Sequence, residues 1–241
     1  MRPLLIGGFC LLLAAFVGLG VWQLDRAAEK RELFDAFAAG QARPARTSLI
    51  TGPMLPEHRY ARLELSGEYL SSKQILLDAM THSGRVGYQV LTPFRPDGAD
   101  TWVIVNRGWI PAAGAQTLPF VAVDESRRAV AGRVDALPRP GLRLEARGAT
   151  TVQRWPRVLL YPTLADVEAA LGLPLAPYQL LLDADQADGF VRAWQPRSMP
   201  PENHIGYAVQ WFSFAVLLAV IAATLQIRAF CHRRRAARDG A

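Results

Sequence analysis

The sequence predicts a membrane protein in which two transmembrane α-helices bracket one extracytoplasmic α+β domain, built mainly of antiparallel β-strands. Three observations lead to this fold class. Uncharged apolar runs stand near both ends of the 241-residue chain, and most of the net positive charge lies after the second run. The residues between the runs alternate between apolar and polar in the way that strands do.

The first uncharged run covers residues 3–24, "PLLIGGFCLLLAAFVGLGVWQL". At about 1.5 Å per residue it forms a helix long enough to cross a hydrocarbon core roughly 30 Å thick. A cleavable signal peptide is the alternative, because the run follows Met1 and Arg2 and has small residues at Gly18 and Gly20. Signal peptides have apolar regions of about 7–15 residues, so we favour a transmembrane helix.

The second uncharged run covers residues 205–227 and is also long enough to span a bilayer. The loop at 25–203 then has the length of a single folded domain on the far side of the membrane. Cys10 and Cys231 both lie outside this loop. The exported domain therefore has neither a disulfide framework nor a Cys-x-x-Cys-His haem attachment site.

The net charge of +6 lies mostly at the ends of the chain. The tail at 228–241 contributes +4 and Arg2 contributes +1, which leaves +1 for residues 3–227. By the positive-inside rule we expect a multi-pass protein of the bacterial inner membrane, with both termini cytoplasmic and the domain periplasmic. The tail suits anionic lipid headgroups, and the interior has no basic patch for nucleic acid. No Arg- and Ser-rich presequence indicates import into an organelle.

Strand-like runs fill the predicted domain. The first helix is expected to continue to Gly40, because Leu33, Phe34 and Phe37 form one apolar stripe. One short helix is expected at 163–172, with Thr163 as its N-cap and Gly172 as its stop. The dominance of strands favours an antiparallel α+β or barrel-like domain over alternating β/α units. The predicted strands cover 60–70, 73–80, 87–94, 101–110, 128–137, 142–148, 178–185 and 190–196.

Catalytic motifs are absent from the sequence of the exported loop. It has no Gly-x-Ser-x-Gly elbow, no His-Glu-x-x-His, no phosphate loop and no dinucleotide fingerprint. His58 and His82 stand in loop-like surroundings, and His232 lies in the basic tail. A membrane-tethered hydrolase would need a nucleophile and base that the sequence does not offer, so we expect no enzymatic activity.

The segment "NRGWIP" at 106–111 allows two interpretations. Asn106, Arg107 and Gly108 are typical of a turn, with Trp109 packed beside it and Pro111 ending the strand. Alternatively, Arg107 faces an anionic partner such as a carboxylate or propionate, which its forked donors suit.

The segment "NHIGYAVQWF" at 203–212 opens the second span. At about 100° per residue, Trp211 lies about 20° from His204, so the two side chains share one helix face. Ala208, Ala215 and Ala222 make this face shallow enough for a flat apolar ligand or another helix. Interfacial aromatics and helix pairing explain these residues. A second explanation is that neutral His204 binds haem iron, with Trp211 against the macrocycle.

Three motifs together resemble the Surfeit locus protein 1 family, the assembly factors of haem-copper cytochrome c oxidase. They are "GVWQLDRAAEK" at the end of the first span, "VNRGWIP" in the domain and "NHIGYAVQWF" at the start of the second span. The three motifs occur in the family's order, and the resemblance covers nearly the whole chain. The family usually has Asn-Asn-His at the second boundary, whereas this chain has Glu202, Asn203 and His204.

The resemblance implies a protein that binds haem a and assists its insertion into the catalytic subunit of the oxidase. It implies His204 and Trp211 as the haem-binding residues, with His204 as an axial ligand of the iron. The partners would be the catalytic subunit, the haem a synthase and membrane lipid. A scaffold that stabilises the subunit without binding haem is the alternative function. The remaining motif residues are assigned structural roles: Gly20, Trp22, Gln23, Arg26, Lys30, Arg107, Gly108, Trp109 and Tyr207.

Overall fold

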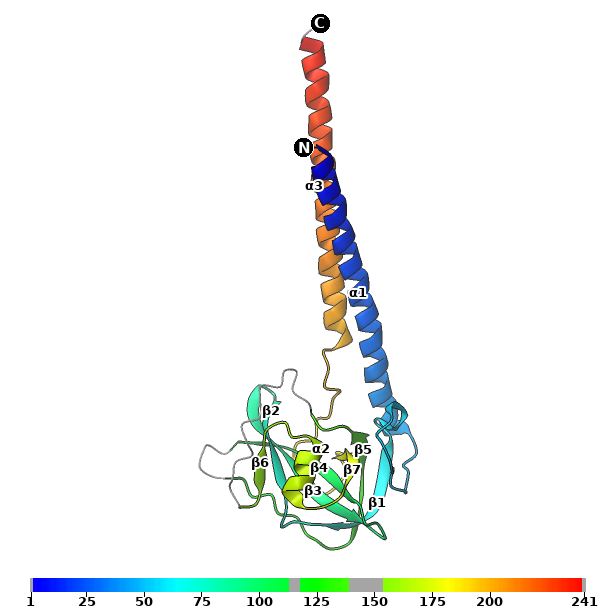
Figure 1. The fold of residues 1–241 in the computed structure, drawn as a ribbon, viewed down its shortest axis with the longest axis vertical. Coiled ribbons are helices and arrows are strands. Elements are labelled where there is room, and N and C mark those ends of the chain that lie inside the picture. The colour runs from blue at the N-terminus through cyan, green and yellow to red at the C-terminus, as the bar shows by residue number, and fades with distance from the viewer. Residues whose placement is uncertain (1, 113–117, 139–153, 240–241) are drawn as a thin grey trace. The chain divides into compact units, whose positions relative to one another are not determined.

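The computed structural model describes residues 2–112, 118–138 and 154–239, which form two compact units (Figure 1). The first, called here the helical unit, combines the residues before 36 with those after 196. The second, called here the β unit, covers residues 36–196. A β-rich unit between two terminal apolar helices agrees with the predicted fold class at this level.

Two long helices supply the helical unit: α1 (Arg2–Ala42) and α3 (Pro201–Asp239). Both contain stretches long and apolar enough to cross a membrane by length and composition. Helix α1 continues beyond its apolar run and ends at Ala42, two residues after the end predicted at Gly40. Its last residues, 36–42, belong to the β unit. Helix α3 begins with Pro201, whose fixed φ suits the first helical position.

Helices α1 and α3 contact each other along a seam with a seven-residue repeat. The least exposed positions of each helix recur at alternating spacings of three and four residues, as in a coiled coil. Pairs from Phe16 with Trp211 to Gln23 with His204 show that the helices run antiparallel. The seam positions are Phe9, Leu13, Phe16, Gly20, Gln23, Ala27 and Lys30 in α1, and His204, Ala208, Trp211, Ala215, Leu218 and Ala222 in α3.

The β unit contains one mainly antiparallel sheet with the order β1-β5-β7-β4-β3-β2-β6 among the described residues (Figure 1). β1 also pairs with β3, so the pairing runs in a closed series through β1, β5, β7, β4 and β3. Only β4 with β7 and β2 with β6 are parallel among the described pairs. The strands are β1 (Arg62–Tyr69), β2 (Ile75–His82), β3 (Arg85–Pro96), β4 (Trp102–Pro111), β5 (Arg128–Asp135), β6 (Arg157–Leu159) and β7 (Leu175–Leu182).

Three core clusters of described residues lie on the sheet, and the smallest includes Leu76 and Val90. Alternate residues of β1 are buried, and Leu63 and Leu65 join one cluster with Phe94 and Leu180. The second cluster lies beneath helix α2 (Leu164–Leu171). As predicted, Thr163 caps this helix by accepting a hydrogen bond from the backbone N–H of Asp166, and Gly172 ends it in the left-handed conformation. A short 3-10 helix, η1, spans Pro56–His58.

Two strand predictions need correction, and a third lies outside the described residues. The predicted strand at 190–196 is wrong, because only Val191 forms a bridge, with Trp109. Its side chains hold this segment instead: Arg192 Nη1 and Trp194 Nε1 donate to backbone carbonyls after and at the end of β7. The short strand β6 was not predicted, and the predicted strand at 142–148 falls outside the described part.

Candidate functional site

The helical unit brings His204 and Gln23 together across the seam. His204 is the fourth residue of α3, and its Nδ1 atom lies 2.8 Å from Oε1 of Gln23 in α1. An amide oxygen only accepts hydrogen bonds, so the imidazole donates from Nδ1. A neutral imidazole has a single N–H, so Nε2 keeps its lone pair.

The Nε2 atom of His204 is shielded from solvent and has no hydrogen-bond partner among the described residues. Leaving a buried polar atom unpaired costs about 1–3 kcal/mol, so such atoms call for an explanation. A neutral imidazole nitrogen with a free lone pair is the form that binds haem iron. By its chemistry His204 fits one axial bond to a haem, and Nε2 is shielded from solvent in this structure.

Trp211 lies on the same seam as His204, as the seven-residue spacing predicts. Its ring stacks on Phe16 of α1, with centroids 5.9 Å apart and an interplanar angle of 29°. Ala208 and Ala215, on either side of Trp211 along this face, are 1% and 7% exposed. Of the two occupants expected for the alanine face, a flat ligand or another helix, the structure therefore has the helix.

Gly20 allows α1 to approach α3 closely. A Cβ atom at this residue would lie 2.6 Å from Cε1 of Phe212. Small residues at helix contacts permit this kind of close packing. Gln23 follows Gly20 along the seam and contacts His204, so two of the motif residues in α1 line the contact with α3.

The other motif residues of the helical unit point away from the seam. Trp22 is 48% exposed, and the guanidinium carbon of Arg26 lies 5.6 Å from the centre of its ring. Arg26 also pairs with Glu29 one turn later, at 2.5 Å. Tyr207 is exposed on α3. These side chains are therefore exposed on faces of α1 and α3 that do not meet the opposite helix.

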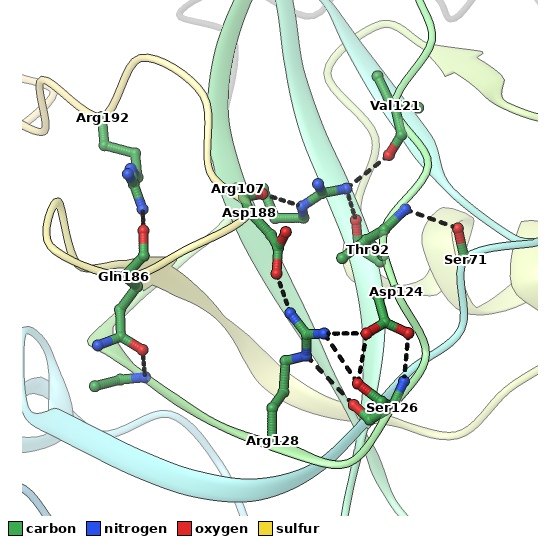
Figure 2. A network of polar contacts seen from close by, with 12 residues as sticks. Ser71, Thr92, Arg107, Val121, Asp124, Ser126, Arg128, Gln186, Asp188 and Arg192 are labelled. Atoms are coloured by element: carbon green, nitrogen blue, oxygen red, sulfur yellow. Dashed lines mark hydrogen bonds and ion pairs between the residues drawn. The ribbon is translucent and has the colours of Figure 1, made fainter.

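The motif "VNRGWIP" centres on Arg107, which is 2% exposed inside the β unit. Its Nε donates to the carbonyl oxygen of Asp188 at 2.7 Å, and its Nη1 donates to that of Val121 at 2.7 Å (Figure 2). Nη1 also donates to Oε1 of Gln74 at 3.1 Å. Burial lowers the pKa of Arg107, although a guanidinium stays charged. Arg107 therefore ties three distant segments to β4.

Arg128 extends this network toward the surface (Figure 2). Its Nη2 lies 3.0 Å from a carboxylate oxygen of Asp124, and its Nη1 pairs with Asp188. Hydrogen bonds from Ser126 hold the pKa of Asp124 below its ordinary value. The segment at 121–128 and the turn at Asp188 are thus bound to the sheet by two arginines.

Gly108 and Trp109 hold the segment after the turn at Asp188. Gly108 has a φ of 115° and accepts the backbone of 190–191 so closely that a Cβ would lie 2.8 Å from the carbonyl oxygen of Val191. The backbone N–H of Trp109 donates to that oxygen at 2.8 Å. The Trp109 indole N–H donates to the carbonyl of Met80, also at 2.8 Å. Gly108 and Trp109 therefore pack the segment at 190–191 against β4.

The predicted turn at 106–108 is wrong, because Asn106, Arg107 and Gly108 lie within β4. The Gly108 N–H donates to Oδ1 of Asn106 at 3.2 Å, at the point where the register between β4 and β3 shifts. The side chain of Arg107 is enclosed by its own chain, so it is not exposed to an external anion. Pairing of Asn106 with β3 and β7, and of Trp109 with β3, keeps this segment in the strand despite its local preference for a turn.

His58 and His82 belong to the β unit, whereas the seam residues belong to the helical unit. His58 belongs to η1. His82 ends β2, and its ring lies 5.3 Å from that of Trp109. The loop expected around His82 is therefore the end of a strand. Within residues 2–112, 118–138 and 154–239, no three His, Cys, Asp or Glu side chains gather as a metal cluster. Cys10 and Cys231 are free cysteines, and both residues are exposed.

Gln23 and Phe16 belong to the candidate site but are not among the site residues predicted from the sequence, where Gln23 has only a structural role. The repeat of three and four residues from Phe9 to Lys30 is the signal that identifies both as seam positions. In the β unit, the amide of Gln74 and the hydroxyl of Thr92 were also missed as partners of Arg107.

Comparison with known proteins identifies the family. The pattern of the SURF1 family matches residues 10–216. A SURF1-like protein of Drosophila melanogaster is 27% identical over 237 residues, which cover 87% of this chain and 74% of the relative. An uncharacterised SURF1-like protein of Mycobacterium bovis is 27% identical, covering 85% and 75%. A SURF1-like protein of Rickettsia conorii is 24% identical, covering 85% and 84%. The chain belongs to the SURF1 family.

Proposed function

We propose that this protein is an assembly factor for haem-copper cytochrome c oxidase. It binds haem a through His204 and assists the insertion of this cargo into the catalytic subunit. The observation that carries the proposal is the state of His204, whose Nδ1 is bonded to Gln23 while its Nε2 is buried and unpaired among the described residues. Membership of the SURF1 family supports the link to oxidase assembly.

In this proposal α1 and α3 span the bacterial inner membrane, with both termini cytoplasmic and the β unit periplasmic. The length and hydropathy of both helices support the spans, and the basic tail after 227 supports the orientation. His204 then lies at the periplasmic end of α3, where an amphipathic porphyrin reaches it from the membrane surface. The protein acts by holding and presenting the haem, together with the haem a synthase and the oxidase subunit, and catalyses no reaction.

Opening of the seam is part of this function. Phe16 covers Trp211, and the alanines beside Trp211 are buried, so the closed pair has no free face for a macrocycle. Haem binding therefore replaces helix–helix contacts near His204, and re-closure of the same contacts favours release. A carrier needs such an exchange, because its ligand must leave as well as bind.

The close helix packing also favours one rival, a scaffold that stabilises the oxidase subunit and never binds haem. The two functions differ at His204. In cells that assemble a haem a oxidase, we would replace the protein with the His204→Ala variant. We would then measure the haem a content of the catalytic subunit and its co-purification with the variant. His232→Ala, an exposed histidine on the same helix, is the matched control.

A carrier predicts that the subunit still co-purifies with His204→Ala but contains little haem a, while His232→Ala behaves as the wild type. Normal haem content in the His204→Ala strain would contradict haem delivery through this residue and favour the scaffold.

A further inference from the structure

We propose that Gln23 is a positioning residue that holds His204 in the Nδ1–H tautomer and so keeps Nε2 available as a metal ligand. This inference deepens the proposed function and rests on it for the identity of the metal group. Gln23 comes from the opposite helix, 181 positions away in the sequence, and its Oε1 lies 2.8 Å from Nδ1.

The chemistry of the two side chains determines the direction of this hydrogen bond. Oε1 of Gln23 has lone pairs and no hydrogen, so the proton between the two atoms belongs to Nδ1 of His204. Histidines that bind metals usually donate their second ring N–H to such an acceptor, which determines both the tautomer and the ring orientation. Gln23 supplies that acceptor from the opposite helix, at a part-buried position of the seam.

The unpaired state of Nε2 is the second observation. This nitrogen is buried and has no partner among the described residues, although its ring is anchored at the other nitrogen. A histidine held only for packing would gain from pairing both nitrogens or from being replaced by an apolar residue. The arrangement instead preserves one unpaired basic nitrogen at the end of the helix pair.

Gly20 makes this contact possible. It lies one turn before Gln23, and even a methyl group at residue 20 would meet the Phe212 ring. Two helices that approach this closely allow a short amide side chain to reach the imidazole directly. Trp22 and Leu24, the neighbours of Gln23 in sequence, are exposed on other faces of α1.

The first test needs no haem. The full-length protein, labelled with ¹⁵N-histidine and purified in detergent, is studied by NMR at a pH where His204 is neutral. Its four histidines give few signals, and His204→Ala assigns the relevant pair. We expect Nδ1 to be protonated and Nε2 unprotonated in the wild type, and this preference to be lost in Gln23→Leu. Gln210→Leu, which removes an exposed amide from α3, should leave the signals unchanged.

The second test uses haem a titrated into the same proteins. Loss of the acceptor in Gln23→Leu is expected to weaken haem binding about 10–100-fold. Gln23→Glu should retain haem and lower the midpoint potential of the bound iron, because a carboxylate acceptor makes the imidazole more basic and stabilises the ferric state. Gln210→Leu again serves as the control for changes in the helix pair.

An unchanged His204 tautomer in Gln23→Leu, or an unchanged haem affinity, would overturn the role of Gln23. A wild type that binds no haem a would overturn the proposed function, while the tautomer measurement would still decide the role of Gln23. The two failures are therefore distinguishable.

Discussion

Gly20 of α1 lies against the ring of Phe212 of α3, so that a Cβ atom at residue 20 would come within 2.6 Å of Phe212 Cε1. This contact brings the helices together one turn from the Gln23–His204 hydrogen bond. The helix seam, the free Nε2 and the proposed haem site therefore depend on one glycine.

Gly20→Val should push the helices apart near His204. We expect the variant to lose the fixed His204 tautomer and to bind haem a at least 10-fold more weakly, as for loss of the histidine's hydrogen-bond partner. Gly18→Val is the control, because a Cβ at Gly18 has no atom within 4 Å. The tautomer is read from the ¹⁵N-histidine spectrum of the full chain, and haem affinity is read from a haem titration. Equal behaviour of the two variants would show that the close approach at Gly20 is not required.

Arg107→Lys should destabilise the β unit by about 2–4 kcal/mol. An ammonium cannot reproduce the forked donation to Asp188 O, Val121 O and Gln74, and the acceptors would be left buried and unpaired. Hydrogen exchange followed by mass spectrometry should show faster exchange at 119–123 and 186–191. Arg127→Lys, at an exposed pair with Asp97, should change stability by less than about 1 kcal/mol. Unchanged exchange in Arg107→Lys would rule out its role as a clamp.

Arg133 and Phe37 should couple in a double-mutant cycle. The guanidinium carbon lies 4.0 Å from the ring centre of Phe37, and Nη1 donates to the Phe37 carbonyl at 3.3 Å. Both residues belong to the β unit, so this pair fastens the last residues of α1 to the sheet. We expect a coupling energy of about 1–2 kcal/mol between Arg133→Met and Phe37→Leu, from urea unfolding of the full chain. Strictly additive effects would contradict this contact.

Burial raises the pKa of Tyr69 from its ordinary 10.0 to about 12. In the unfolded chain the phenol ionises first, so stability present below pH 10 is lost as the pH rises toward 12. Tyr69→Phe removes this loss. The stability difference between wild type and variant should therefore shift by roughly 1 kcal/mol between pH 8 and pH 10.8, in favour of the variant. A difference that does not change with pH would show that the Tyr69 phenol is not desolvated.

Local signals in the sequence predicted much of the fold. The alternation in 62–69 predicts β1, and the burial pattern follows it residue by residue. The cap at Thr163 and the stop at Gly172 predict α2 because both act within one helical turn. The apolar stripe around Phe37 likewise predicts that α1 continues beyond its uncharged run.

Features that depend on distant residues could not be predicted in the same way. Asn-Arg-Gly at 106–108 is locally typical of a turn, although it lies inside the predicted strand at 101–110. Asn106 pairs with both β3 and β7, and the register with β3 shifts between Asn106 and Trp109, so the segment is an irregular part of β4. The segment at 190–196 has the composition of a strand, but its side chains anchor it by hydrogen bonds to carbonyls of another segment. The Gln23–His204 contact requires the relative register of two helices, which neither helix encodes by itself.

The helix face shared by His204 and Trp211 was predictable, because seven residues make almost two full turns. The state of that face was not, since Ala208 and Ala215 suit a ligand and a helix equally well. The structure covers it with α1 and stacks Trp211 on Phe16. In the proposed function, haem binding therefore requires the seam to open.

The most direct test is the optical spectrum of the full-length protein, purified in detergent from cells that make haem a. Wild type, His204→Ala and Trp211→Ala would be compared at equal protein concentration. We predict a haem a band in the wild type, its loss in His204→Ala, and a weaker or shifted band in Trp211→Ala, since the indole would no longer support the macrocycle. A wild type without haem a, or a His204→Ala spectrum identical to the wild type, would contradict axial ligation by His204.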